Sequence, residues 1–233
     1  MEYELILVSD VHCAQTRQVA GEFLRDEDHY LERGLNLGPA NSRNLGLTQA
    51  RGQYVLFFDD DDELPPVDYD KFLSEAFKSP RQVTFGDIVI VREDREKGLL
   101  TGEPPSRIDV SGCNIDQIYV KNFIPLPAAV FPRWVAQRCL FDPYMESLED
   151  WDFMLQALSK TDFSPVNLLT AIVYKDFVNM GNRRGSSVEA MGVKAILEYL
   201  YVYRRWPAPS AEIYKQREIL LTHFGLKQVA EIY

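Results

Sequence analysis

Short apolar runs alternate with amphipathic segments along most of the chain. Four runs rich in β-branched and aromatic residues are too short for helices and predict strands, at residues 3–8, 54–58, 83–91 and 168–174. Apolar residues at helical spacing predict helices at residues 15–24, 40–50 and 69–77, and Gly or Pro near the ends of the latter two supports them. The pattern indicates an α/β protein.

The C-terminal part is helical by the same criterion. Residues 196, 199, 200 and 203 form one apolar face, and residues 211–224 form a second amphipathic segment. We therefore expect an α/β domain at residues 1–187 and a helical extension at residues 188–233 that packs on it. Aromatic and basic residues of the extension also suit contact with a membrane surface or a glycan, namely Tyr201, Arg204, Arg205 and Trp206.

Composition narrows the class of protein. The 233 residues, 46% of them hydrophobic, suffice for one globular catalytic domain with a sizeable core. With 25 Lys and Arg against 35 Asp and Glu, the net charge of −10 argues against a broad nucleic-acid surface. Three scattered cysteines without a C-x-x-C suggest neither disulfides nor zinc, and no apolar stretch is long enough for a membrane span. We expect a cytoplasmic protein.

An acidic run follows the predicted strand at residues 54–58. Asp59, Asp60, Asp61, Asp62 and Glu63 are consecutive carboxylates at the end of a buried strand, where they repel one another unless a cation is bound. If strand geometry continues, alternate side chains point the same way, so Asp59 and Asp61 can meet at one hard divalent ion. The alternative is a solvated acidic loop, which is what most charge runs form.

The segment before this strand supports a ligand site. Gly38 and Pro39 open a helical pattern, and polar residues near its beginning include Arg43. Backbone N–H groups and the helix dipole favour anions at such a position. The acidic run and this helix start thus suit a metal ion and an anionic ligand, respectively.

Together, residues 36–66 (NLGPANSRNLGLTQARGQYVLFFDDDDELPP) resemble the N-x-G-x-x-x-x-R-N-x-G and D-x-D-D motifs of family 2 glycosyltransferases with a GT-A fold. The resemblance implies a Rossmann-like mixed sheet flanked by helices, followed here by the helical tail. It also implies a nucleotide-diphosphate sugar as donor, with a UDP-sugar expected, and Mn²⁺ or Mg²⁺ held by Asp59 and Asp61. We count Arg43, Asp59 and Asp60 among the donor-binding residues.

By this alignment the chain lacks the usual first strand and first helix of the family. Residues 3–10 (YELILVSD) resemble the second strand, whose terminal aspartate, here Asp10, contacts the nucleoside. Either this strand moves into the place of the missing one, or the nucleotide pocket is incomplete. An ordinary turn aspartate is the alternative for Asp10.

A second acidic motif lies in residues 141–158 (FDPYMESLEDWDFMLQAL). With Ser147 as the N-cap, Glu149 and Asp150 fall in the first turn of a helix, where the helix dipole stabilises carboxylates. On this evidence alone they merely cap the helix. The motif also resembles the family's E-D-W sequence, which implies that Asp150 is the catalytic base and Glu149 its supporting neighbour.

A basic pair follows the last predicted strand. Arg183 and Arg184 lie in a glycine-flanked stretch and could hold a diphosphate by bidentate hydrogen bonds, although surface arginine pairs are common. In this region the family often has Arg-x-His, with a histidine that assists the metal. Lys175, Asp176 and Phe177 stand here instead, so no histidine ligand is expected.

These features predict a metal-dependent, inverting glycosyltransferase that moves a sugar to a hydroxyl acceptor, with a glycan as the expected acceptor. The alternative is a degenerate GT-A domain that binds a nucleotide or glycan, or scaffolds a partner, without transfer. The missing first strand favours the alternative, whereas the two acidic motifs favour an enzyme.

Overall fold

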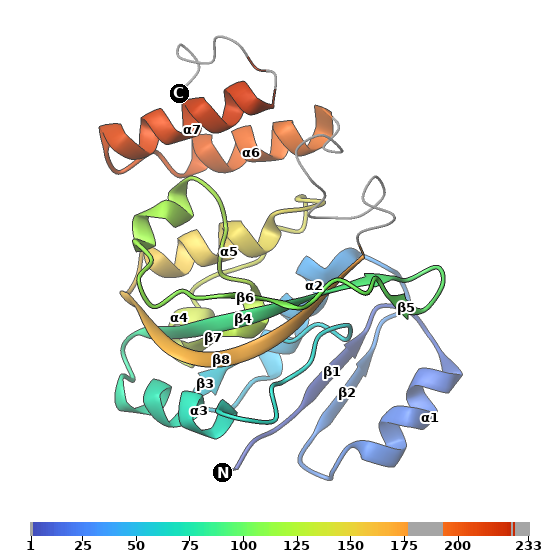
Figure 1. The fold of residues 1–233 in the computed structure, drawn as a ribbon. Coiled ribbons are helices and arrows are strands. Elements are labelled where there is room, and N and C mark those ends of the chain that lie inside the picture. The colour runs from blue at the N-terminus through green and yellow to red at the C-terminus, as the bar shows by residue number, and fades with distance from the viewer. Residues whose placement is uncertain (1, 177–192, 225, 227–233) are drawn as a thin grey trace.

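The computed structural model describes residues 2–176, 193–224 and 226 (Figure 1). The strands are β1 (Ile6–Ser9), β2 (His29–Glu32), β3 (Tyr54–Val55), β4 (Val83–Asp94), β5 (Leu99–Leu100), β6 (Ser106–Ile108), β7 (Ala129–Pro132) and β8 (Phe163–Asp176). The helices are α1 (Ala14–Phe23), α2 (Gly38–Gln49), α3 (Tyr69–Lys78), α4 (Arg133–Ala136), α5 (Glu149–Leu158), α6 (Val193–Arg205) and α7 (Ala211–His223), with short 3-10 helices η1 (Ile115–Tyr119) and η2 (Leu126–Ala128). The predicted mixed α/β fold is confirmed.

The main sheet is built on β4. One edge of β4 pairs in turn with β7, β6 and β5, all antiparallel, and the other edge pairs with β8 in parallel. Gly86 marks a register shift against β8, and a Cβ there would lie 2.4 Å from the Thr170 Cγ2 atom and 2.6 Å from the Leu168 carbonyl oxygen. Only glycine allows this close approach of the two strands.

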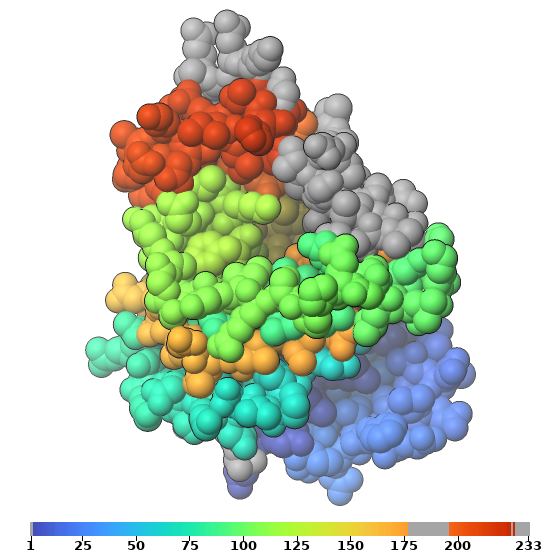
Figure 2. Space-filling view, in the orientation of Figure 1, coloured from blue at the N-terminus to red at the C-terminus, as the bar shows by residue number. Residues whose placement is uncertain are grey.

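The N-terminal strands form a separate sheet. β1 pairs with β2 in parallel, and in the described part of the chain β1 makes no ladder with β3. Residues 6–35 lie beside the main sheet, as the blue segment at the lower right of Figure 2. The YELILV strand therefore has not moved into the place beside β3.

The helices lie on both sides of the main sheet. Figure 1 shows α3 on one side, and α5 on the other side with α6 and α7 stacked beyond it. Trp151 of α5 packs on Tyr199 and Tyr203 of α6, with ring centroids 5.1 and 5.8 Å apart. These residues belong to one hydrophobic cluster with the sheet. The predicted domain boundary at residue 187 lies outside the described residues.

The buried Asp152 carboxylate of α5 contacts two residues at the C-terminal end of α6. Asp152, whose side chain is fully buried, accepts a hydrogen bond from the Trp206 Nε1 atom at 2.7 Å and lies 3.3 Å from the Arg205 Nη1 atom. The Gln156 Nε2 atom donates a further bond at 2.7 Å. A carboxylate can remain in a core only when it has such partners.

Three local predictions were wrong. The ladder of β3 ends at Val55 instead of residue 58, because β7 pairs with it through two residues and none of the described strands pairs with its other edge. Residues 92–107 are charged, contain Gly and Pro and have no clear period, a pattern that predicts an irregular loop. They instead form part of a hairpin in which Gly98, at φ +63°, lets β5 fold back on β4. Ser147 does not cap α5, because Leu148 takes the N-cap position in the left-handed region, at φ 62°.

Candidate active site

The acidic run forms a turn that is fixed to β8. The Asp62 backbone N–H donates to the Asp59 carbonyl at 3.2 Å, which closes the turn. Glu63 and Ile172 then exchange two backbone hydrogen bonds of 2.9 Å. The carboxylates are thereby held at the edge where β4 and β8 also end, a usual place for ligands in α/β sheets.

Three carboxylates of this turn converge. One oxygen each of Asp59, Asp61 and Asp62 lies within 4.8 Å of the others. The sequence predicted only Asp59 and Asp61 from strand alternation. In a turn the following residue also points inward, so Asp62 joins the group. Asp60 is exposed, and the described residues offer it no hydrogen bond or ion pair.

The cluster has the electrostatics of a cation site. Burial and the neighbouring Asp61 and Asp59 carboxylates raise the pKa of Asp62 to about 7. Hard oxygen ligands are those that Mg²⁺ and Mn²⁺ prefer, so the residues fit a divalent ion. Two arginines offset part of the negative charge: the Arg43 Nη2 atom lies 2.6 Å from Asp59, and the Arg95 Nη1 atom 2.8 Å from Asp61.

Arg43 joins the two acidic motifs. Its Nη1 atom lies 3.0 Å from the Glu149 Oε1 atom, while its Nη2 atom holds Asp59. The guanidinium is mostly buried, and the Glu149 side chain is only 6% exposed. Because a planar guanidinium can bind two carboxylates at once, Arg43 fixes the acidic turn relative to the start of α5.

Aromatic packing produces the same juxtaposition. Phe57, two residues before the acidic turn, contacts Phe153 of α5 with ring centroids 5.2 Å apart. Phe131 of β7 and Phe141 complete the group, and Phe141 stacks on Phe153 at 4.1 Å. The buried faces of the strand and helix therefore bring together carboxylates that are about ninety positions apart in the sequence.

Asp150 is oriented by two hydrogen bonds. The Asn122 Nδ2 atom donates to its Oδ2 atom at 3.1 Å, and the Trp151 backbone N–H donates to its Oδ1 atom at 2.8 Å. Burial, and after it the negative charge of Glu149, raises the pKa of Asp150 from its ordinary value of 3.8 to about 6. A carboxylate with such a pKa can accept a proton near neutral pH.

The remaining predicted residues are less central. Asp10, at the end of β1, accepts a short hydrogen bond from the Ser42 hydroxyl, next to Arg43 on α2. Its carboxylate is thus at the correct edge but already has a partner. Arg183 and Arg184 lie outside the described residues.

The sequence analysis missed four residues of this region. Asp62 was hidden by the strand assumption, and Arg95 by the assumption that residues 92–107 form an irregular loop. Asn122 belongs to neither of the acidic motifs, so the sequence pattern gave it no role. Lys175, at the end of β8, lies close enough to Asp150 and Asp62 that both act on its pKa, although burial and then Lys121 lower that pKa overall.

The architecture matches solved structures of GT-A proteins. Staphylococcus aureus TarS 1-349, in complex with UDP-GlcNAc, superposes with a TM-score of 0.65 at 18% identity, over 99% of this chain and 67% of that chain. At this level of identity the likeness concerns the fold, and it shows the mixed sheet with flanking helices of the GT-A class.

The sequence carries the classification further. Residues 1–126, more than half of the chain, match Glycosyl transferase family 2. The chain belongs to this family, as its motifs predicted.

Two curated relatives agree with the assignment. An uncharacterized glycosyltransferase of Haemophilus influenzae is 24% identical over 204 residues, which cover 85% of this chain and 66% of the relative. A Campylobacter jejuni protein named GalNAc(5)-diNAcBac-PP-undecaprenol beta-1,3-glucosyltransferase is 32% identical over 95 residues, which cover 40% of this chain and 30% of the relative. The chain thus spans less than two thirds of the length of either relative.

Proposed function

We propose that the protein is a metal-dependent, inverting glycosyltransferase that uses a nucleotide-diphosphate sugar. The observation that carries the proposal is the Arg43 bridge, which joins the candidate metal-binding turn at Asp59 to the Glu149-Asp150 pair of α5. A donor diphosphate at the turn and an acceptor hydroxyl at Asp150 would then share one site, as a direct displacement requires.

In the proposed reaction Asp150 takes the proton of the acceptor hydroxyl. The acceptor oxygen attacks the anomeric carbon from the face opposite the leaving group, the bond from that carbon to the diphosphate oxygen breaks, and the sugar inverts. Asp59, Asp61 and Asp62 would hold Mn²⁺ or Mg²⁺, which supplies positive charge to the departing diphosphate. Asn122 keeps the Asp150 carboxylate aimed at the acceptor.

The donor is proposed to be a UDP-sugar, because the structural neighbour TarS is recorded with UDP-GlcNAc. A glycan is the proposed acceptor, and the name of the Campylobacter relative, whose acceptor is a lipid-linked glycan, supports this class. No helix in the described segments is long and apolar enough to cross a membrane. A cytoplasmic location and peripheral membrane contact stay predictions.

Removing a carboxylate of the turn should uncouple donor binding from the metal. Asp61→Ala is expected to weaken UDP binding in the presence of Mn²⁺ about tenfold or more. The loss of a ligand lowers the affinity for the ion, and the ion neutralises the diphosphate. Asp62→Asn should act in the same direction. Calorimetric titration with UDP, with and without Mn²⁺, measures this. Equal UDP affinities of Asp61→Ala and the unmodified protein in Mn²⁺ would contradict the metal assignment.

The pH dependence should carry the signature of Asp150. Because the base must be deprotonated, kcat/KM is expected to rise with pH and level off above an apparent pKa of about 6. The fold favours the protonated form, so the contribution of this group to stability is greatest below pH 3.8 and falls as the pH rises through about 6. A pH–rate profile with its acid limb near pH 4 would argue against Asp150 as the base.

A degenerate, non-catalytic domain is the second candidate. It is favoured by β1, which pairs only with β2 among the described strands and leaves the place beside β3 without a partner strand. UDP titration followed by a donor-hydrolysis assay over a panel of nucleotide sugars separates the candidates. Binding without turnover of any donor would support the degenerate domain.

A further inference from the structure

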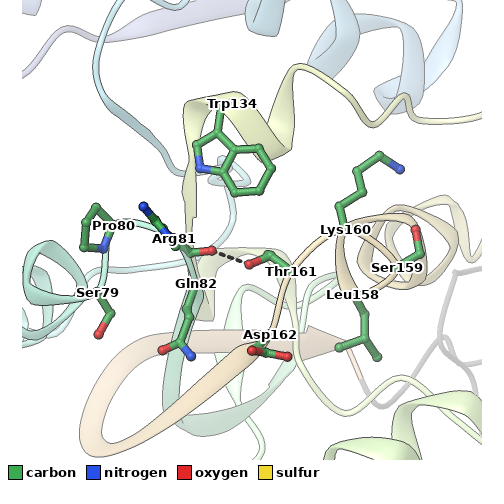
Figure 3. A pocket seen from close by; sticks show the side chains of 10 residues that line it. All are labelled: Ser79, Pro80, Arg81, Gln82, Trp134, Leu158, Ser159, Lys160, Thr161 and Asp162. Atoms are coloured by element: carbon green, nitrogen blue, oxygen red, sulfur yellow. Dashed lines mark hydrogen bonds between the residues drawn. The ribbon is translucent and has the colours of Figure 1, made fainter.

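A hollow of about 830 Å³ opens at the far end of the sheet from the acidic turn (Figure 3). It lies where β4 and β8 begin, whereas the carboxylates lie where these strands end. The Arg133 backbone N–H donates to the Gln53 carbonyl at 2.9 Å, which places the neighbouring Trp134 near the start of β3. At about 3.3 Å per residue, residues 53–59 separate hollow and turn by roughly 20 Å. The hollow is therefore distinct from the candidate active site.

The walls of this hollow are held by the backbone. The Thr161 hydroxyl donates a short hydrogen bond to the Arg81 carbonyl, drawn as the dashed line in Figure 3. The Val83 N–H donates to the Asp162 carbonyl at 3.1 Å, and the Gln82 N–H to the Ser79 carbonyl at 3.0 Å. The hollow is thus formed before any ligand arrives, which lowers the cost of binding.

Several side chains that line the hollow can contact a ligand. Trp134 is 39% exposed, and the Arg138 guanidinium lies 5.4 Å from its ring. The side chains of Arg81, Gln82 and Asp162 make no hydrogen bond or ion pair with other residues in the described part of the chain. A partly exposed indole, which has Arg138 as a neighbour, thus borders the same space as a cation, an amide and a carboxylate that have no such partners in the described part of the chain.

This combination suits a sugar better than other ligands. The face of an indole carries partial negative charge and attracts the C–H bonds on the apolar face of a pyranose. Ring hydroxyls both donate and accept, so they can use Asp162 as well as Arg81 and Gln82. Lys160 also lines the hollow, but its Nζ atom donates to the Gln156 carbonyl at 3.2 Å, near the end of α5. Because α3 and α5 both end at the hollow and present the negative ends of their dipoles, a phosphate or carboxylate ligand is disfavoured.

We propose that this hollow is a second binding site, remote from the reaction centre, for a neutral oligosaccharide. Trp134 stacks on one sugar ring, while Gln82, Arg81 and Asp162 hold its hydroxyls. The choice of a glycan as ligand rests on the proposed function. Bound there, a long acceptor chain is kept on the enzyme while its end reaches the active site some distance away.

Nuclear magnetic resonance can test the site, because the protein has only three tryptophans. Trp134→Phe identifies the Trp134 indole N–H signal. The probes are chitotetraose and maltotetraose, titrated to about 10 mM. We expect at least one probe to shift the Trp134 signal in a saturable manner and to leave that of the buried Trp151 unchanged.

Variants decide whether the binding uses this hollow. Trp134→Ala and Asp162→Asn should each lower the affinity for the probe, the former about tenfold. The affinity is measured from the shifts of the backbone signals of residues 79–82. Phe23→Ala, which removes an aromatic ring that is 77% exposed on α1, serves as matched control and should bind normally. The absence of any shift with both probes, or unchanged affinity in Trp134→Ala, would overturn the site. A UDP and Mn²⁺ titration on the same samples reports separately on the proposed function.

Discussion

Asp150→Asn is expected to reduce sugar transfer by about 10²–10⁴-fold while leaving UDP affinity within a factor of about two. The substitution keeps the shape of the side chain, but an amide has a single acceptor oxygen, so it can keep only one of the bonds from Asn122 and Trp151. An amide also cannot take the proton of the acceptor. Steady-state turnover and UDP titration, measured on the same preparation, give the two quantities.

Two variants make this result interpretable. Asp26→Asn changes an exposed aspartate far along the chain from both acidic motifs, and it should leave turnover and stability unchanged. Asn122→Ala, which frees one side of the Asp150 carboxylate, should lower kcat less than Asp150→Asn does. If Asp150→Asn retained full turnover, the proton would have to leave by another group and the proposed mechanism would fail.

Arg43→Met should have the largest effect on stability. Breaking a buried ion pair by removing one partner typically costs about 3–5 kcal/mol, because the other charge stays in the core. Here the carboxylate of Glu149 loses its Arg43 contact while it is almost fully buried. Arg43 also lowers the pKa of Asp150, so the acid limb of any residual activity should move to higher pH. Urea denaturation and a pH–rate profile measure the two effects.

A substitution of Glu149, the partner of Arg43, supplies the control. In the double variant Arg43→Met with Glu149→Gln, the buried Glu149 charge is removed together with its Arg43 partner, and part of the lost stability should return. Arg43→Lys retains the charge but cannot hold Asp59 and Glu149 in one planar fork, so it should fall between the two. A double variant that is less stable than the sum of the single variants would show that the pair is not what joins the motifs.

Much of the fold was predictable from local patterns. The helix expected at residues 69–77 is α3 (Tyr69–Lys78), and that expected at residues 211–224 is α7 (Ala211–His223). The family resemblance also predicted the mixed sheet. In these segments side-chain periodicity and end signals act together with the tertiary packing, and local reasoning then succeeds.

The failures occurred where tertiary contacts outweighed local preference. Residues 56–58 have the composition of a strand, but no strand in the described part of the chain forms a ladder with them. Leu148 is a poor candidate for the left-handed region, yet the link between Met145 and α5 requires it, and Ser147 instead bonds to Glu198. No sequence pattern reports on a partner that lies fifty residues away.

The candidate site was predictable in its residue types and less so in its geometry. The family motifs indicated Arg43, Asp59 and Asp150, but the bridge from Arg43 to Glu149 depends on how α2 and α5 pack. Asp62 and Arg95 became visible only once the acidic turn and the hairpin after β4 were placed. Their roles are set by the path of the backbone, which composition does not report.

The contact between Asp152 and Trp206 has a consequence for how such chains can diverge. The Asp152 carboxylate is buried in the helix that carries the proposed base, and besides Gln156 of α5 its partners are Arg205, at the end of α6, and Trp206, directly after it. A substitution on one side alone would leave buried polar groups without partners. A C-terminal segment taken from a relative would have to place an indole and a guanidinium against Asp152. We therefore expect substitutions at Asp152 to occur together with substitutions at Arg205 or Trp206.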